Sequence, residues 1–524
     1  MAFEIRDCVT EGKEALPMVF QSILFRRSGE VTSEAPAFFV DLNLDQIIGA
    51  ITAGRQEYNL KPFFYSPLHD EDSIRYRQEI MQELENETLM KNIKAFAEKM
   101  VVTRRYLALV DKLDFKNFQE GWFWEAAEVY CEAITGLAHD LGQASLKSAG
   151  FLSFRDYLAN YIGSDGFTSL LAEAKRLKTA LSTIRYCVII NGLAVRVRKY
   201  EGEADYSVEV EQTFEKFKQG AVKDYRVKLY EGSVMNHVEA QIVDCVARLY
   251  PDIFTSLDNF YAQYSLFLSE TISVFDREIQ FYIAYVEFIS IFKRAGLKFC
   301  YPQVSGQSKE IYDYEGFDLA LANKLIPERS PVVCNNFYLR DKERIFVVSG
   351  PNQGGKTTFA RTFGQLHYLA SLGCPVPGKE ARLFLYDKLF THFEREENIK
   401  DLRGKLEDDL VRIHDILSQA TSNSIMIINE ILTSTTLQDA IFLSKEVMQK
   451  LIQLGVLGVW VTFVEELASF SEKTVSLVST VVPENPALRT FKIVRRPADG
   501  LSYAIAIAEK HRLTYASLKE RIKP

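Results

Sequence analysis

One eight-residue stretch limits the possible folds of this chain more than any other part of it: Gly350-Pro351-Asn352-Gln353-Gly354-Gly355-Lys356-Thr357. It has the spacing G-x-x-x-x-G-K-[ST] of a phosphate-binding loop. An apolar run at 344–349 precedes it, and apolar residues follow at helical spacing until Gly373. Strand, loop and helix thus come in the order that the motif requires, which predicts nucleotide binding. The alternative is a chance glycine-rich turn.

The residue types in this loop suit a triphosphate and its metal ion. Glycines let the backbone come close to the phosphates, and the N–H groups at the start of the helix point at the anion. We expect Lys356 to reach the outer phosphates and Thr357 to hold magnesium. The expected ligands are therefore ATP and Mg²⁺.

The composition is that of a large protein with several cores. The 524 residues, of which 47% are hydrophobic, suggest about three domains. The formal net charge is −8, so no overall basic field indicates nucleic acid, although a local basic surface stays compatible with it. The seven cysteines are scattered and never in C-x-x-C spacing, which favours reduced thiols and a cytoplasmic location.

The sequence indicates neither a membrane segment nor a metal cluster. The N-terminus meets charge at Glu4 and Arg6 and has no signal-type apolar run. The most apolar stretch, 281–292, is interrupted by Glu287 and is too short to span a bilayer, so we expect it to be a core helix. The seven histidines never pair at metal spacing, and His392 is expected to be a packed or interface residue.

The chain changes character near residue 300. Upstream, long amphipathic patterns such as 73–101 and 256–293 predict long helices. The segment 306–331 contains Ser, Lys, Glu and Pro and is interpreted as the join between the two halves.

A β-hairpin is expected within the helical half. Its strands are predicted at 185–190 and 193–198, around an Asn191-Gly192 turn. These strands carry three arginines, Arg185, Arg196 and Arg198. Arginines in such a hairpin suit contact with a phosphate backbone, and a solvated polar face is the more common reason for them. Both interpretations stay open.

Downstream of residue 330, strands alternate with helices. Short apolar runs at 424–428 and 456–461 are bounded by polar residues, with a helical pattern at 439–454 between them. Together with the strand before the phosphate loop, they predict a mostly parallel sheet covered by helices, as in an α/β P-loop NTPase domain.

Asn429 and Glu430 directly follow one of these predicted strands. P-loop ATPases usually end that strand with an aspartate that supports magnesium, followed in some families by a glutamate that polarises the attacking water. Asn429 can bond a metal-bound water but adds no charge, so magnesium affinity should be lower. Glu430 is the candidate catalytic base; the alternative is an ordinary surface carboxylate at a strand end.

With its Pro351-Asn352 pair and its extension to Thr358, the phosphate loop resembles that of the MutS family of DNA mismatch-repair ATPases. The similarity is strong over about 330–520 and weak over 60–300. It implies that Asn335 lies beside the adenine and that Thr435 and Asp439 belong to a loop that crosses a dimer interface. Other segments that match the family's pattern are Ser66-Pro67-Leu68 with Asp70, Ile74 and Arg77, Asn336, Ile416-Leu417, Ala420-Thr421, Ile431 and Thr436.

Several positions depart from the family's pattern. Gly404-Lys405-Leu406 stands where the family has a Ser-Thr-Phe element opposite the partner's γ-phosphate, and Phe463 stands where it has a switch histidine. Lys405 could supply positive charge to that phosphate or could be an ordinary surface lysine. Together with Asn429, these changes imply slower hydrolysis or a retuned ATPase cycle, but not loss of ATP binding.

The resemblance implies an N-terminal segment at 1–60, a mainly helical core and lever region at 61–305, and a MutS-type ATPase domain at 306–524. No N-terminal mismatch-recognition domain is expected. The implied function is that of a homodimeric ATPase that acts as an ATP-driven clamp on duplex or branched DNA, with no membrane partner. The alternative is a MutS-like switch acting on a protein or ribonucleoprotein.

Overall fold

The chain forms two compact units, which we call the helical unit and the α/β unit. The computed structural model describes residues 20–26, 29, 31–192, 194–203, 237–394, 404–498, 513–515 and 518–519. The helical unit comprises residues 1–21, 86–147 and 151–276, and the α/β unit comprises 22–85, 148–150 and 277–524. This division differs from the expected ranges, because 22–85 and 277–305 pack with the ATPase segment rather than with the helices between them.

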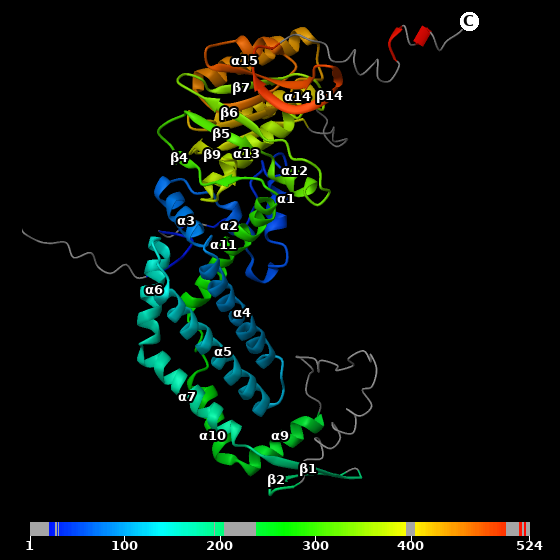
Figure 1. The fold of residues 1–524 in the computed structure, drawn as a ribbon. Coiled ribbons are helices and arrows are strands. Elements are labelled where there is room, and N and C mark those ends of the chain that lie inside the picture. The colour runs from blue at the N-terminus through cyan, green and yellow to red at the C-terminus, as the bar shows by residue number, and fades with distance from the viewer. Residues whose placement is uncertain are drawn as a thin grey trace, which may run out of the picture. The chain divides into compact units, whose positions relative to one another are not determined.

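Helices dominate the helical unit (Figure 1). The long helices α4 and α5 pack on each other, and α7 and α10 pack against α5. The Phe154 ring stacks on Phe275 with their centroids 3.5 Å apart, and Phe123 meets Phe267 edge to face. The elements of this unit are α4 (Glu87–Val110), α5 (Lys116–Gln143), α6 (Ala149–Ile162), α7 (Asp165–Ser182), β1 (Tyr186–Asn191), β2 (Ala194–Lys199), α9 (His237–Leu249), α10 (Pro251–Gln263) and the first part of α11 (Glu270–Arg294).

The two longest helical patterns are each interrupted, so their prediction as single helices was wrong. The pattern at 73–101 is divided between α3 (Glu71–Glu83) and α4. Asn86 starts α4 by accepting a hydrogen bond from Leu89 N at 3.0 Å, and such a side-chain cap begins a new helix instead of continuing the previous one. The pattern at 256–293 is likewise broken between α10 and α11.

The predicted hairpin is present, but its turn lies one residue further along the chain than expected. Strands β1 and β2 pair antiparallel, and the last pair joins Asn191 to Ala194, so Asn191 belongs to the strand and not to the turn. Arg198 is engaged by acidic neighbours, with Nη2 2.5 Å from the Glu203 carboxylate. Several apolar side chains of the hairpin are exposed, Ile190 most of all at 72%.

Among the described residues of the α/β unit, six strands form one sheet in the order β10-β11-β12-β7-β13-β14. All neighbouring pairs are parallel except β13 with β14, which confirms the predicted mostly parallel sheet. Its strands are β7 (Ile345–Ser349), β10 (Leu389–Phe393), β11 (Ile425–Asn429), β12 (Leu457–Val461), β13 (Thr474–Val482) and β14 (Asn485–Arg495).

Helices cover both faces of this sheet (Figure 1). On one face, Phe346 of β7 contacts Phe359 and Phe363 of α13 (Lys356–Ser371). On the other face, Met426, Ile428 and Trp460 share a core with α14 (Lys405–Gln419) and α15 (Leu437–Leu454). Because β7, β11 and β12 are buried on both faces, their sequences are continuous apolar runs without alternation.

A second sheet, in the order β4-β9-β5-β6, occupies part of the segment interpreted as a join. Strand β5 and helix α12 lie within 306–331, so that interpretation was wrong: the segment is an integral part of the α/β unit. The remaining elements of this unit are α1 (Leu44–Ile51), η1 (Gln56–Tyr58), α2 (Lys61–Tyr65), β3 (Phe299–Cys300), β4 (Gln303–Ser305), β5 (Ile311–Gly316), α12 (Leu319–Leu325), β6 (Asn335–Leu339), β8 (Val376–Pro377), β9 (Glu380–Phe384) and η2 (Glu465–Ser469).

The apolar stretch 281–292 is part of α11 and is mostly buried, as predicted. Its one acidic residue, Glu287, forms an ion pair with Arg55. Within the described residues, no helix combines the length and the apolar character needed to cross a bilayer.

Candidate functional site

The predicted phosphate loop links β7 to α13 and is held by its neighbour β13. Gly350 and Gly355 have φ values of 112° and 89°, a region that side chains with a Cβ rarely adopt. At Gly354, a Cβ would lie 2.2 Å from Ser479 Oγ, which donates a hydrogen bond of 2.7 Å to the Gly354 carbonyl. The glycines are therefore required by backbone geometry and by close packing against β13.

Lys356 is buried, with its ammonium group inside the loop. Its Nζ donates to the carbonyl oxygens of Gly350 and Pro351 at 3.1 and 3.2 Å, and to Asn352 Oδ1 at 3.3 Å. Its side chain is only 6% exposed, and the Glu430 carboxylate lies 3.5 Å away. Burial lowers the pKa of Lys356, and Glu430 partly opposes this effect. A buried cation ringed by acceptors that a phosphate can replace fits a triphosphate site.

Thr357 and Asn429 meet although they are far apart in the sequence. The Thr357 hydroxyl donates a hydrogen bond of 2.8 Å to Asn429 Oδ1. Strands β7 and β11 run parallel in one sheet, so the start of α13, which follows β7, and the end of β11 lie at the same edge. Hydroxyl and amide oxygens are hard ligands of the kind that Mg²⁺ accepts. The pair fits a magnesium site that lacks the usual negative charge.

Glu430 lies at the first position after β11, in an unusual backbone conformation. Its φ is 50°, in the left-handed region, and its N–H donates to the Val461 carbonyl at 2.9 Å. Its side chain is 36% exposed. The carboxylate thus lies beside the phosphate loop and remains accessible, as a base that activates water must be.

Strand β14 adds two residues to the site that we did not predict. Arg489 Nε donates to the Asn352 carbonyl at 3.1 Å, beside the phosphate loop. Phe491 is 48% exposed and has a φ of 58°, and a Cβ on Gly355 would lie 3.8 Å from its side chain. The sequence signal was weak, because an arginine and a phenylalanine in a strand belong to no local motif.

Asn335 connects β6 to this part of β14. Its Nδ2 donates to the Phe491 carbonyl at 3.1 Å, and its Oδ1 accepts from Ile493 N at 2.8 Å. Both hydrogen-bonding groups of its side chain are thus used to hold β14. Asn335 therefore fixes the backbone of β14 at Phe491.

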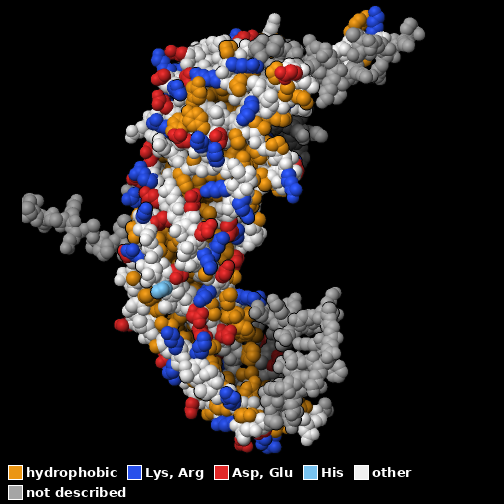
Figure 2. Space-filling model, in the orientation of Figure 1, with side chains coloured by type: hydrophobic (Ala, Val, Ile, Leu, Met, Phe, Trp, Pro, Cys, Tyr) orange, Lys and Arg blue, Asp and Glu red, His pale blue; other side chains and the backbone are white. Residues whose placement is uncertain are grey.

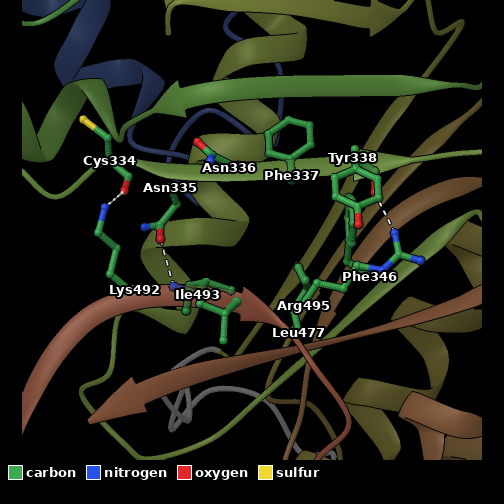
Figure 3. Close-up of a pocket in the computed structure, with 11 residues that line it drawn as sticks. Cys334, Asn335, Asn336, Phe337, Tyr338, Phe346, Leu477, Lys492, Ile493 and Arg495 are labelled. Carbon is green, nitrogen blue, oxygen red and sulfur yellow. Dashed lines mark hydrogen bonds between the residues drawn. The ribbon is translucent and has the colours of Figure 1, made fainter. Parts of the chain in front are cut away.

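A pocket of about 280 Å³ lies along the same two strands (Figure 3). Phe337, Tyr338 and Phe346 supply aromatic surface, and Lys492 bridges one side by donating to the Cys334 carbonyl at 2.5 Å. The other residues that line it are Asn335, Asn336, Leu477, Ile493, Val494 and Arg495. Its apolar wall with a few polar groups has the character of a small-ligand pocket.

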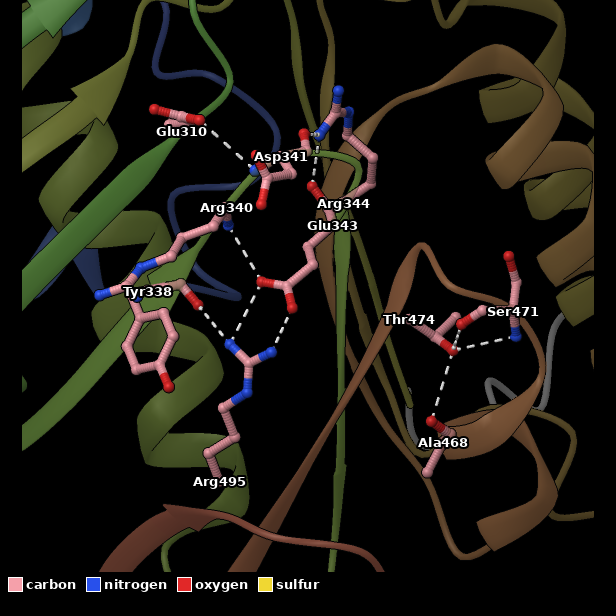
Figure 4. A network of polar contacts seen from close by, with 10 residues as sticks. All are labelled: Glu310, Tyr338, Arg340, Asp341, Glu343, Arg344, Ala468, Ser471, Thr474 and Arg495. Atoms are coloured by element: carbon pink, nitrogen blue, oxygen red, sulfur yellow. Dashed lines mark hydrogen bonds and ion pairs between the residues drawn. The ribbon is translucent and has the colours of Figure 1, made fainter.

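Arg495 anchors the end of β14 (Figure 4). Its guanidinium pairs with the Glu343 carboxylate and lies 4.6 Å from the centre of the Tyr338 ring. Arg340 lies at the same distance from that ring. These contacts fix the strand that carries Arg489 and Phe491 near the phosphate loop.

The residues expected to act across a dimer interface occupy two helix starts. Gly404 is the residue before α14, and Lys405 is its first residue. Lys405 forms an ion pair with Glu394 of the same chain. The Thr435 hydroxyl donates a hydrogen bond of 3.4 Å to the Asp439 carboxylate. The neighbouring Thr436 hydroxyl caps α15 by accepting from Asp439 N. All four have local roles within one chain.

Phe463 lies shortly after β12, at the position where the resemblance would place a switch histidine. Its side chain is 49% exposed. The neighbouring Thr462 hydroxyl is used locally, because it accepts a hydrogen bond from Val464 N at 3.0 Å. His392 is fully buried, as the packed interpretation predicted, and the described residues contain no group of side chains arranged for a metal cluster.

The chain was compared with known proteins. The family model of MutS domain V matches residues 346–520. Endonuclease MutS2 of Thermus thermophilus is 31% identical over 197 residues, which are 37% of this chain and 26% of that protein. DNA mismatch repair protein MutS of Zymomonas mobilis is 34% identical over 135 residues, 26% of this chain and 16% of the relative. The protein of the same name from Petrotoga mobilis is 24% identical over 297 residues, 55% and 30% respectively. Each match thus spans less than a third of the relative's length.

Proposed function

Because the chain belongs to the MutS family, we propose that it is an ATP-binding and hydrolysing homodimer that acts on DNA. The observation that carries this proposal is the meeting of three groups at one sheet edge: the buried Lys356 ammonium, the Thr357–Asn429 pair and the Glu430 carboxylate. These are the parts that phosphoryl transfer from a nucleotide requires. Free thiols at the six described cysteines support a cytoplasmic location.

In this proposal, the phosphate loop binds the triphosphate. The N–H groups of Gly355 and of the first turn of α13, which includes Thr358, would point at the phosphates, and Lys356 would exchange its carbonyl partners for phosphate oxygens. The exposed Phe491 ring offers a surface on which the base can stack.

Magnesium would be held by Thr357 directly and by Asn429 through a water molecule. The ion would neutralise charge that develops on the transferred phosphate. Because Asn429 contributes no charge, the site depends more on Thr357 and on the nucleotide itself for its affinity. We therefore propose that hydrolysis is slow.

Glu430 is the proposed base. It is accessible, it lies beside the Lys356 ammonium, and the left-handed turn points its side chain away from β11 into the loop region. A second subunit would complete the site by bringing Gly404, Lys405, Thr435 and Asp439 to the nucleotide. Lys405 must then leave its ion pair with Glu394, which costs little because exposed ion pairs are weak.

A protein or ribonucleoprotein partner is the second candidate for what the dimer acts on. The net charge of −8 favours it, and basic and acidic side chains are interspersed on the visible face of the molecule (Figure 2). The names of the relatives, which include an endonuclease and mismatch repair proteins, favour DNA.

Two measurements test the proposal. Lys356→Ala should lose tight ATP binding and keep the fold, and an affinity within a few-fold of wild type would contradict the nucleotide site. Binding to branched and linear DNA at several salt concentrations should show an affinity that falls with salt, because phosphate contacts release counterions. No binding to either form at low salt would favour the protein partner.

A further inference from the structure

The turn after β11 stores backbone strain next to the proposed base. Both Glu430 and Leu432 have positive φ values, 50° and 60°. Left-handed conformations are strained for non-glycine residues, so they persist only where the surroundings hold them. Ile431 and Leu432 are 5% and 0% exposed, so their packing in the core holds the turn after Glu430 in place.

Two hydrogen bonds hold the backbone of this turn. Glu430 N donates to the Val461 carbonyl at 2.9 Å, as a continuation of the sheet. Leu432 N donates to Asp409 Oδ2 at 3.2 Å, and Asp409 belongs to α14. The second bond therefore connects the turn of Glu430 to a helix that is distant in the sequence.

Asp409 is itself fixed by buried groups. Its side chain is 8% exposed, and its Oδ1 lies 3.4 Å from Nε2 of His392, which belongs to β10. Burial lowers the pKa of His392, as does the positive charge of Arg412, while Asp409 opposes them. Arg412 lies on α14 and donates to the Phe393 carbonyl at 3.2 Å. A neutral histidine thus faces the carboxylate that holds the turn.

A second connection between α14 and this region lies at the helix start. The Glu394 carboxylate accepts from the Thr433 hydroxyl at 3.2 Å and pairs with Lys405. Lys405 begins the helix, and Asp409 lies one turn later on the buried side. The helix that carries the proposed interface lysine is therefore tied to the turn of Glu430 at two points.

We propose that Asp409 is a positioning residue that couples α14 to Glu430. A shift of α14 when two subunits close on ATP would move Asp409, and the strained turn would move the Glu430 carboxylate with it. Hydrolysis would then depend on dimer closure through a contact inside one subunit. This inference rests on the proposed function, because it needs Glu430 as the base and α14 at the interface.

The experiment compares Asp409→Asn and Asp409→Ala with Asp415→Ala, an exposed aspartate on the same helix. ATP affinity, ATP-dependent sedimentation as a dimer, and turnover over a range of protein concentrations are measured for each. Alanine leaves the Leu432 N–H buried without an acceptor, so the turn should relax. Asparagine keeps the volume and one oxygen that can accept from Leu432 N, but it removes the carboxylate charge that faces His392.

Both Asp409 variants should bind ATP and dimerise like Asp415→Ala, within about twofold. Their turnover should fall, at least tenfold for alanine and threefold for asparagine, and should no longer rise as dimers form. If Asp409→Ala does not fold, Asp409→Asn alone decides. Turnover of Asp409→Asn equal to that of the control, or a parallel loss of ATP affinity, would overturn the coupling. Normal turnover of Glu430→Gln would instead refute the proposed function.

Discussion

The Thr357 hydroxyl and the Asn429 amide oxygen are 2.8 Å apart, joined by a hydrogen bond between the helix after the phosphate loop and the end of β11. In an aspartate version of this pair, a negative charge would face the metal ion. Here the Asn429 amide oxygen makes the contact without a charge. The position of the two residues is therefore compatible with magnesium, while the electrostatic attraction is reduced.

Restoring the charge should raise the affinity for magnesium. Asn429→Asp has nearly the same shape, so Thr357 keeps its hydrogen bond, and the added carboxylate attracts a nearby divalent cation. We expect the magnesium concentration for half-maximal ATPase activity to fall several-fold. Asn423→Asp, in the loop before β11, is the matched control. An unchanged magnesium dependence would place the ion elsewhere.

Glu430→Gln should bind ATP but lose turnover by roughly two to four orders of magnitude, because the amide cannot take a proton from water. Single-turnover hydrolysis and equilibrium ATP binding separate the two effects. Glu466→Gln, an exposed residue after β12, should behave like the wild type. If Glu430→Gln hydrolyses ATP at the normal rate, another group is the base.

Lys405→Glu should weaken ATP-dependent dimerisation more than ATP binding by one subunit. The substitution places negative charge opposite the partner's triphosphate, and in the single chain it also faces Glu394. Sedimentation with ATP, a non-hydrolysable analogue and ADP measures the dimer, and Lys450→Glu on α15 is the control. A monomer with all three nucleotides, or unchanged dimerisation and turnover of the variant, would contradict the shared site.

Phe491→Ala should weaken ATP binding roughly two- to tenfold, the range expected for the loss of about 0.5–1.5 kcal/mol of stacking. Leu488→Ala removes a similarly exposed apolar side chain from the same strand and should have little effect. Comparison of ATP with tripolyphosphate sharpens the test, because binding of a ligand without a base should not respond to Phe491. Equal losses for both ligands would show that Phe491 supports only the loop.

His367 on α13 should make the α/β unit less stable in mild acid. Burial lowers the pKa of His367 from 6.5 to about 4. The unfolded chain therefore binds a proton that the folded chain excludes, so stability is full above pH 6.5 and falls between pH 6.5 and about 4, by about 3 kcal/mol in total. His367→Gln should flatten the pH dependence of the unfolding free energy, whereas the exposed His414→Gln should not. The lowered pKa of His392 acts in the same direction, so some dependence should remain.

The local pattern of the sequence was enough to predict the phosphate loop, the parallel sheet and the position of the consecutive residues Asn429 and Glu430 at a strand end. Each of these leaves a signal within a short stretch of the chain: glycines in a tight loop, and apolar runs that match a strand buried on both faces. The same local pattern misled us over 73–101, where the cap formed by Asn86 outweighs the helical periodicity on either side.

Only the tertiary structure decided which distant residues complete the site. Asp409 reaches Leu432, and Asn335 reaches Phe491, across 23 and 156 residues of sequence. Such contacts depend on the order in which strands assemble and on how helices lie over them, and no short-range pattern records that order. Sequence periodicity therefore determined the elements and the loop chemistry, while packing determined the groups that hold the catalytic turn, because burial and hydrogen-bond partners exist only once the sheet has formed.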